Sequence, residues 1–446
     1  MGYIPHTSQE RDEMLKVIGA KSLEDLFSHL PDAVKCGPLD VPPGLGEMEL
    51  SAELRRIASK NRPASDLACF LGAGAYDHFI PPVVGELISR GELYTAYTPY
   101  QPEISQGVLQ LIYEYQTMIA SLCGLDVSNA SLYDGATALV EALTVALRQT
   151  SRNVVILDGA LHPAYIEVAR AALRALHLTP EIVLARADFR SDTAGLLARA
   201  KAAGEQAACV AIGYPNFYGS VEDLSGFTQS VKDTGALAIS VGTPFPYGLM
   251  TPPGHLGFDL ACGEAQALGV PLQYGGPYLG YIASTKSLVR RMPGRLVGKT
   301  LDVQGRTAYT LTLQAREQHI RREKATSNIC TNTALCAMMA HFYMSCLGKN
   351  GLKRAGELSV SKADLLRRKL KGAKGVKAVP DYPVFHEFVI ETEKPAAQVL
   401  EAQLTKGILG GLDLGRYDGS RKHQLLVCVT EKRSTEEIDA YVKSLA

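Results

Sequence analysis

The sequence predicts an α/β protein with a large domain built on a mostly parallel sheet and a small α+β domain at its C-terminal end. Between residues 61 and 330, short apolar runs alternate with segments of helical periodicity, as expected for parallel strands that are buried on both faces. From residue 331 to 446 the pattern changes to two long helices followed by alternating strands and helices. With 446 residues, 46% of them hydrophobic, the chain can bury a large core and a smaller one.

Residues 1–60 are predicted to form an N-terminal arm. Apolar side chains recur at helical spacing in 10–18 and 23–30, and turns rich in proline and glycine follow. Such a segment is too small to bury a core of its own. We therefore expect the arm to wrap around another domain or another subunit.

Each element of the two domains follows from the spacing of apolar residues. In the large domain, helices are predicted at 105–122, 162–176, 192–203 and 223–234, and strands at 154–157, 181–185, 208–213, 236–241, 259–262 and 278–283. In the small domain, helices are predicted at 331–347, 352–370 and 396–405, and strands at 384–390 and 425–429. A capping box of Ser434 and Glu437 predicts the start of the last helix.

The overall charge balance excludes several functional classes. Lys+Arg and Asp+Glu both total 46, so no general attraction to nucleic acid or to an anionic membrane is expected. The nine cysteines form no CxxC pair and fit no zinc-binding pattern, so we expect no metal site. No apolar stretch is long enough to span a membrane, and no leader peptide is visible. A soluble, cytoplasmic protein is the expectation.

A turn of small residues at Gly135, Ala136 and Thr137 precedes a predicted helix. Small residues at a helix N-terminus let backbone N–H groups approach a phosphate, and the helix dipole favours its negative charge. Many enzymes that use pyridoxal phosphate (PLP) place the cofactor phosphate on such a turn. An ordinary connection between a strand and a helix would have the same sequence.

His162 begins the helix that follows the strand predicted at 154–157. That position lies at the functional edge of a parallel sheet, where PLP enzymes place an aromatic or histidine side chain against the cofactor ring. A histidine that caps the helix is an equally good interpretation.

Two positions lack the groups that hold PLP in enzymes of this architecture. The matching strand of those enzymes ends in an aspartate that keeps the pyridine nitrogen protonated, but the residue before Gly242 is Val241. We align Gln266 with the histidine that commonly precedes the cofactor-binding lysine, and Ala267 with the lysine itself. Ala267 has no amine, so an internal Schiff base is excluded there. The sequence therefore predicts a degenerate cofactor pocket around Gly135, Ala136, Thr137, His162 and Gln266, with no catalytic residue in this chain.

Two further segments are candidates for an interface. Tyr97, Tyr100, Gln101 and Glu103 lie in a proline-containing loop, and rigid tyrosine-rich loops commonly line pockets or interfaces. Core packing is the alternative for this loop. A basic run contains Arg316, His319, Arg321 and Arg322. One interpretation is a segment that contacts another subunit or binds an anion, because arginine pairs with carboxylate and phosphate. The other is a solvated charged face with a helix cap.

These residues also resemble a known family. Segments 3–7, 97–103, 129–132, 269–272 and 274–277 are similar to the P-protein of the glycine cleavage system, and specifically to glycine dehydrogenase (decarboxylating) subunit 1, its alpha chain. The string REQHIRREKATSN at 316–328 is more specific than any single-turn motif. The resemblance covers essentially the whole chain.

The resemblance implies the aspartate-aminotransferase-like fold of PLP enzymes (fold type I). It implies that a complex of two copies of this subunit and two copies of subunit 2 decarboxylates glycine. The aminomethyl group then passes to the lipoyl arm of the H-protein. PLP would be bound by subunit 2 and not by this chain, which alone would be inactive.

Two alternatives remain open. A free-standing PLP enzyme, such as an aminotransferase, would need another lysine. Lys286, the nearest one downstream of position 267, lies beyond the next predicted strand and is expected to be exposed. The second alternative is a non-enzymatic scaffold that stabilises a related enzyme.

Overall fold

The computed structural model describes residues 5–37, 40–325, 327–329 and 331–446. Tyr3, Ile4 and Thr326, which belong to segments of family resemblance, lie outside the described residues. The chain divides after Arg62 into two compact units, which are described separately below.

The first unit contains the predicted arm. Its two α-helices are α1 (Ser8–Ile18) and α2 (Glu47–Ala58). Thr7 and Glu10 form a capping box at the start of α1, which satisfies two backbone N–H groups that the helix leaves unpaired. In these two helices only Leu15 is buried. Large apolar side chains along the arm are more than half exposed: Val17, Ile18, Phe27, Val34, Val41, Leu45, Met48 and Leu54.

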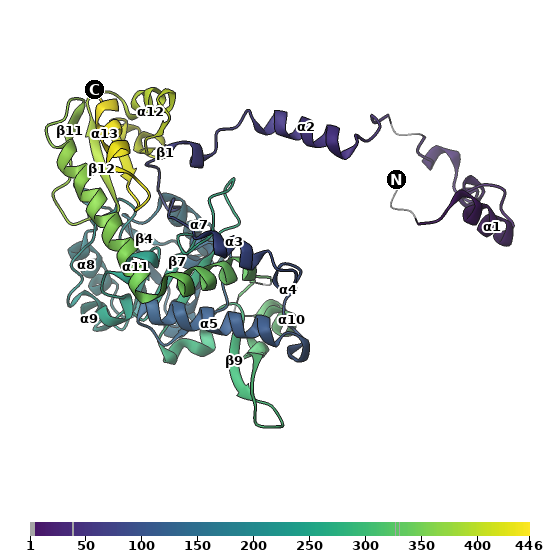
Figure 1. The fold of residues 1–446 in the computed structure, drawn as a ribbon. Helices are drawn as coiled ribbons and strands as arrows, with labels where there is room; N and C mark the ends of the chain where they lie inside the picture. The colour runs from purple at the N-terminus through teal and green to yellow at the C-terminus, as the bar shows by residue number, and fades with distance from the viewer. Residues whose placement is uncertain (1–4, 38–39, 326, 330) are drawn as a thin grey trace. The chain divides into compact units, whose positions relative to one another are not determined.

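A seven-stranded sheet is the centre of the second unit (Figure 1). Its spatial order is β2-β8-β7-β6-β5-β3-β4, and the neighbours from β7 to β4 pair in parallel. β8 is antiparallel to both β7 and β2. The strands are β2 (Val127–Ser128), β3 (Val154–Asp158), β4 (Glu181–Val183), β5 (Ala207–Gly213), β6 (Leu237–Val241), β7 (Leu260–Glu264) and β8 (Gly280–Ser284). The sequence prediction of a mostly parallel sheet is confirmed.

Helices cover both faces of this sheet. On one face α6 (Gly135–Thr150) and α7 (Pro163–Ala175) pack with the Cys209 and Ala211 side chains of β5. On the other face α5 (Gln106–Cys123), α8 (Thr193–Ala203) and α9 (Phe227–Lys232) pack with Val210 and Ile212 of the same strand. Successive side chains of a strand point to opposite faces, so an apolar strand can supply both cores. This explains why the strands are uninterrupted apolar runs.

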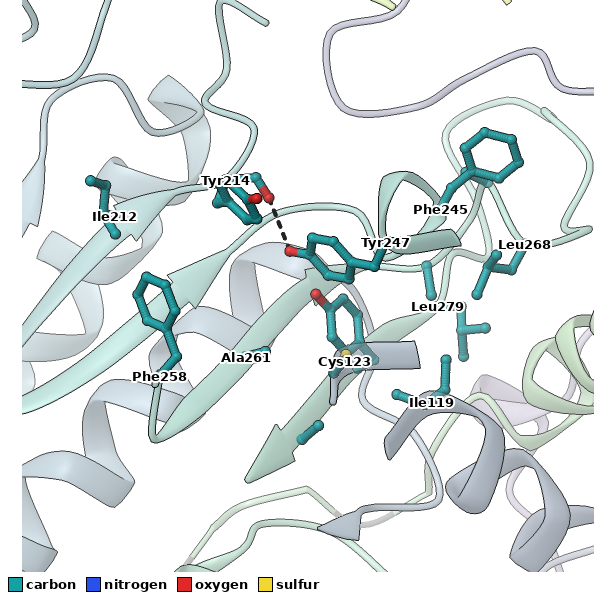
Figure 2. Packing of buried hydrophobic residues seen from close by; sticks show 14 of the residues in the cluster. Ile119, Cys123, Ile212, Tyr214, Phe245, Tyr247, Phe258, Ala261, Leu268 and Leu279 are labelled. Atoms are coloured by element: carbon teal, nitrogen blue, oxygen red, sulfur yellow. Dashed lines mark hydrogen bonds between the residues drawn. The ribbon is translucent and has the colours of Figure 1, made fainter. Parts of the chain in front are cut away.

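Figure 2 shows part of the core that lies between the sheet and α5. Phe258 and Phe245 are almost fully buried and belong to the same cluster as Ile119 and Cys123 of α5. The Tyr247 hydroxyl donates a hydrogen bond to the backbone carbonyl of Tyr214 at 2.9 Å. A buried tyrosine thus keeps a partner for its hydroxyl while its ring fills the core.

The small domain is built on a second, antiparallel sheet in the order β11-β12-β15-β14. Its strands are β11 (Val376–Ala378), β12 (Glu387–Thr392), β14 (Leu412–Asp413) and β15 (Gln424–Cys428), and its helices are the second part of α11 (Ala334–Leu370), α12 (Ala396–Thr405) and α13 (Thr435–Ser444). Gly348 has non-helical backbone angles inside α11, so the two long helices predicted there are confirmed as two segments that meet at this residue. The capping box of Ser434 and Glu437 is also confirmed.

Other elements differ from the prediction. The helix predicted at 223–234 is only α9, six residues long, because Gly226 adopts a left-handed conformation (φ 73°) directly before it. An antiparallel hairpin, β9 (Leu296–Leu301) and β10 (Thr307–Thr312), was not predicted. A strand at the start of the second unit, β1 (Ala68–Cys69), pairs with β13 (Ile408–Leu409) and joins the beginning of this unit to the small domain.

In the described parts of the chain, every helix is too short or too polar to cross a membrane.

Candidate functional site

Two adjoining cavities lie at the carboxyl ends of the parallel strands. The inner one has a volume of about 60 Å³ and contacts Gly213, Val241 and Glu264, which end β5, β6 and β7. The outer one has a volume of about 770 Å³. The two cavities share four lining residues: Gly74, His162, Tyr165 and Glu264. Open α/β folds bind their ligands at this edge of the sheet, which makes the cavities the candidate functional site.

The N-terminus of α6, which contains the small-residue turn at 135–137, faces two carboxylates. The backbone N–H of Gly135 donates to Glu264 Oε2 at 3.0 Å. The N–H of Thr137 donates to Asp134 Oδ1 at 2.8 Å, as part of a capping box. These side chains satisfy the first and third N–H groups of the helix and place negative charge where a phosphate would bring its own.

The Glu264 carboxylate also anchors the segment that follows β7. Its Oε1 atom accepts hydrogen bonds from the backbone N–H groups of Gln266 (3.0 Å) and Leu279 (2.8 Å). Burial raises the pKa of Glu264 to about 7, although its three backbone hydrogen bonds act in the opposite direction. A side chain of the protein itself, Glu264, therefore takes the backbone N–H group that a bound anion would need.

His162 is placed as a helix cap. Its Nδ1 atom accepts a hydrogen bond from the N–H of Ala164 at 3.0 Å, and its Nε2 atom lies 3.1 Å from the carbonyl of Ala73. The ring stacks on Tyr165 with centroids 5.0 Å apart, and burial lowers the pKa of the imidazole. The structure shows the capping contact of His162, while a position of this ring against a cofactor stays a prediction.

Gln266 and Ala267 lie next to the site without lining it. The Gln266 side chain accepts from Tyr76 N at 2.8 Å and donates to the carbonyls of Tyr76 and Val270. Ala267 is 2% exposed and packs in the core between the sheet and α5. Glu264, three residues earlier, is the member of this segment that lines both cavities. The alignment of residue 267 with a lysine stays a prediction.

The residues that line these cavities do not fit PLP. Among those described, none is a lysine that could bond to its aldehyde, and none is an arginine that could hold its phosphate. Val241, which we aligned with the aspartate that pairs with the pyridine nitrogen, lines the inner cavity with an apolar side chain. Tyr165 also covers the turn closely, because a methyl group added at Gly135 would lie 2.0 Å from its hydroxyl oxygen.

A second buried carboxylate, Glu387 of β12, lines the inner cavity from the small domain. It accepts hydrogen bonds from the N–H of Ala73 at 2.6 Å and from the hydroxyl of Tyr76 at 2.9 Å. Only 2% of Glu387 is exposed, and burial raises its pKa to about 7. The side chain therefore connects the small domain to the segment that enters the second unit.

This elevated pKa predicts that Glu387 destabilises the fold at higher pH. Below about pH 4.5 the carboxyl group is protonated in both states, whereas between about pH 4.5 and 7 the unfolded chain ionises first. From pH 5 to pH 8 the wild type should therefore lose about 2 to 3 kcal/mol of unfolding free energy that Glu387→Gln retains. Urea unfolding at both pH values measures the difference. Glu391→Gln, with a side chain that is 42% exposed on the same strand, is the control and should behave like the wild type. Parallel pH profiles of wild type and Glu387→Gln would contradict the prediction.

The structure brings the two predicted interface segments together. The Tyr100 ring meets the His319 ring edge-on, with centroids 6.2 Å apart. Tyr97 is 75% exposed, and the other predicted residues of both segments are exposed except Arg316: Gln101, Glu103, His319, Arg321 and Arg322. Arg316 is turned inward, where its guanidinium donates to the carbonyls of Met292 and Gly294. Its role is therefore to hold the 292–294 segment, while its neighbours remain on the surface.

Four residues that shape the site were not predicted. They are Glu264, Glu387, Tyr165 and Asp134. For Glu264 a signal existed, since it is the one charged residue in the run of apolar and small residues 260–264. For Glu387 no local signal existed, because its partners Ala73 and Tyr76 lie more than 300 positions away.

The central sheet with its antiparallel β8, the small C-terminal domain and the cavities at the strand ends define a protein with the fold of the type I PLP-dependent enzymes. One solved structure with this fold, a lysine-to-alanine mutant of C-DES with glycine covalently linked to PLP, has a TM-score of 0.61 at 14% identity and covers 86% of this chain and 97% of its own. That likeness shows the fold alone.

The chain belongs to the glycine cleavage system P-protein family, whose model matches residues 1–445. It is 46% identical over 444 residues to the probable glycine dehydrogenase (decarboxylating) subunit 1 of Listeria monocytogenes serotype 4a (strain HCC23), which covers 99% of this chain and 98% of the relative. A crystal structure of the glycine decarboxylase (P-protein) of the glycine cleavage system, in inhibitor-bound form, superposes with a TM-score of 0.90 at 43% identity, covering 100% of this chain and 99% of the other.

Proposed function

We propose that this chain is the subunit of a cytoplasmic glycine dehydrogenase (decarboxylating) that does not bind the cofactor. It would assemble with a PLP-bearing subunit 2, two copies of each, to release carbon dioxide from glycine. The aminomethyl group would then pass to the lipoyl arm of the H-protein. The observation that carries this proposal is the N-terminus of α6, where Glu264 and Asp134 already take the N–H groups that a cofactor phosphate would need.

On this proposal the chain contacts its partner and helps to exclude water from the active site that the partner carries. Loss of a carboxylate charge is easier where water is excluded. The exposed tyrosine loop and the exposed apolar side chains of the arm are suited to burial against another subunit. Both are therefore assigned to subunit contacts or to contact with the H-protein.

Co-expression with subunit 2 tests which subunit binds PLP and whether both are needed for activity. We expect native mass measurement to give a complex with two copies of each chain, and cofactor analysis to give one PLP per subunit 2. Glycine–bicarbonate exchange should need both chains, because this chain alone lacks the electron sink that the cofactor supplies and subunit 2 alone lacks the enclosure assigned to this chain. A yellow chain that retains PLP after borohydride treatment would overturn the proposal in favour of a free-standing PLP enzyme. Full activity of subunit 2 alone would favour a scaffold.

The interface assignment makes a separate prediction. In the reconstituted complex, Tyr97→Phe and Arg321→Ala should each weaken binding at the interface by about threefold or more, which corresponds to about 0.7 kcal/mol. The loss should appear either in the association of the subunits or in the H-protein concentration that gives half of the maximal rate. Lys201→Ala, at an exposed position at the end of α8, is the control and should change neither. Unchanged exchange, unchanged H-protein dependence and unchanged assembly in both variants would reject the assignment.

A further inference from the structure

The outer cavity at the sheet edge is mostly apolar, with negative charge at the start of α6. Its described lining residues include two carboxylates, Asp134 and Glu264, and no lysine or arginine. Leu71, Leu272 and several alanine and glycine residues form much of the remaining wall. Three tyrosine rings also line the cavity: Tyr133, Tyr165 and Tyr278. Tyr133 is 38% exposed, so the cavity is open to solvent.

The two carboxylates lie at one turn without a counter-cation among the described lining residues. Gly135 directly follows Asp134 and donates its N–H to Glu264, which brings both side chains to the start of α6. Glu264 is 5% exposed, and the charge of Asp134 raises the pKa of Glu264, because like charges repel. Burial lowers the pKa of His162, so that ring brings no positive charge near neutral pH. The dipole of α6 supplies roughly half of a positive charge, which offsets only part of the negative charge.

The helix cap uses only one oxygen of Asp134. Its Oδ1 atom accepts from both the N–H of Thr137 at 2.8 Å and the hydroxyl of the same residue at 3.1 Å. The Oδ2 atom takes no part in this capping box, and the side chain is partly exposed. Oδ2 is therefore the acceptor that remains for a donor in the cavity, and its use would leave the cap intact.

We propose that the outer cavity binds a primary ammonium group carried on a slender apolar chain. An ammonium group has three donors and no acceptor, so it matches a wall that offers carboxylate oxygens. Its positive charge would lie beside Asp134 and Glu264, while the apolar chain would pack on the leucine side chains and tyrosine rings. The cavity volume of about 770 Å³ is many times the roughly 10 to 15 Å³ that one water molecule requires. A phosphate or carboxylate ligand would instead be repelled by both side chains.

The identity of the natural ligand rests on the proposed function. The reaction proposed above leaves an aminomethyl group on the lipoyl arm of the H-protein. That arm is a slender apolar chain, and its new end is a primary amine, which two neighbouring carboxylates would favour in its protonated form. The outer cavity is thus assigned to hold the loaded arm. A free alkylamine has the same chemistry, so the experiment distinguishes the two sources.

The experiment titrates the full chain, without subunit 2, with hexylamine in a calorimeter at pH 8, above the pKa of about 7 of Glu264. We expect saturable binding to the wild type, and binding weaker by about tenfold or more in D134N and in E264Q, because each variant removes one charge beside the ammonium. D134N keeps the helix cap, since asparagine caps as well as aspartate. E401Q removes an exposed carboxylate from α12 and should bind like the wild type. Hexanol, which has the same chain without the charge, should also bind at least about tenfold more weakly.

Equal binding of hexanol and hexylamine, or undiminished binding in D134N, would overturn the proposal. Glu264 also anchors backbone groups, so D134N alone decides the matter if E264Q does not fold.

Competition identifies the source of the amine. H-protein that carries the aminomethylated arm should displace hexylamine, and H-protein with an unloaded arm should do so at least about tenfold more weakly. Displacement by neither form would overturn the assignment of the arm. Since no step uses subunit 2 or PLP, the amine site can fail while the complex still exchanges glycine, and the reverse outcome is equally recognisable.

Discussion

Replacing Glu431 with alanine is expected to lower the free energy of unfolding by about 3 kcal/mol or more, because it leaves three hydrogen-bond partners of the buried carboxylate unpaired. Glu431 follows β15, and its side chain is 10% exposed. Its carboxylate lies 2.7 Å from His78 Nδ1, accepts from the N–H of Phe79 at 2.6 Å and accepts from the Ser359 hydroxyl at 3.1 Å. One side chain thus holds the entering segment, α11 and the small-domain sheet together.

The stabilisation that Glu431 provides should decrease as the pH falls. Burial alone would raise the pKa of Glu431, but the hydrogen bond and the charge interaction with His78 lower it to about 2. The stabilisation is therefore fully present above about pH 4.5 and is lost as the pH falls toward 2. Urea unfolding should show the largest difference between wild type and Glu431→Ala near neutral pH. Glu401→Gln, at an exposed position on α12, should match the wild type. A difference that grows on acidification would refute this account.

The second large effect is expected at Gly219, where Gly219→Ala should cost about 3 kcal/mol or more. A methyl group at this position would lie 1.7 Å from the backbone oxygen of Glu387, which cannot move without shifting β12. The residue also has a φ of 87°, a left-handed conformation that costs an alanine about 1 to 2 kcal/mol. The measurement is the urea midpoint, together with the yield of folded protein.

Gly226→Ala separates the two causes of this loss. Gly226 has a similar φ of 73°, but a methyl group there would meet nothing within 4 Å. Its cost should therefore be only the conformational part, about 1 to 2 kcal/mol. Equal destabilisation of the two variants would show that the close approach of Gly219 to β12 is unimportant.

Elements with a regular apolar pattern along their whole length were predictable. The helix predicted at 105–122 is α5 (Gln106–Cys123), and the strand predicted at 208–213 is β5 (Ala207–Gly213), because apolar spacing alone defines each. The β9–β10 hairpin was missed because only its base is buried, while Lys299, Thr300 and Leu301 are exposed. Burial that changes along a strand leaves no regular alternation to detect.

The position of the candidate site could be predicted from the sequence, but the charged residues that line it could not. The glycine turn at residue 135 and the end of β6 at Val241 were placed correctly by motif, since chain order fixes which strand ends meet. The groups that fill the site come from distant segments. Glu264 reaches Gly135 across 129 positions, and Glu387 reaches Tyr76 across 311. Neither pairing has a local sequence pattern.

The carboxylate of Glu264 at the start of α6 has an evolutionary consequence. A mutation that restored an amine near the strand ends would still leave an acidic group where the cofactor's phosphate must bind, so it would confer no benefit by itself. On the proposed function, a cofactor site in this chain would therefore require at least two coordinated changes. The acidic side chain thus makes dependence on a cofactor-binding partner difficult to reverse.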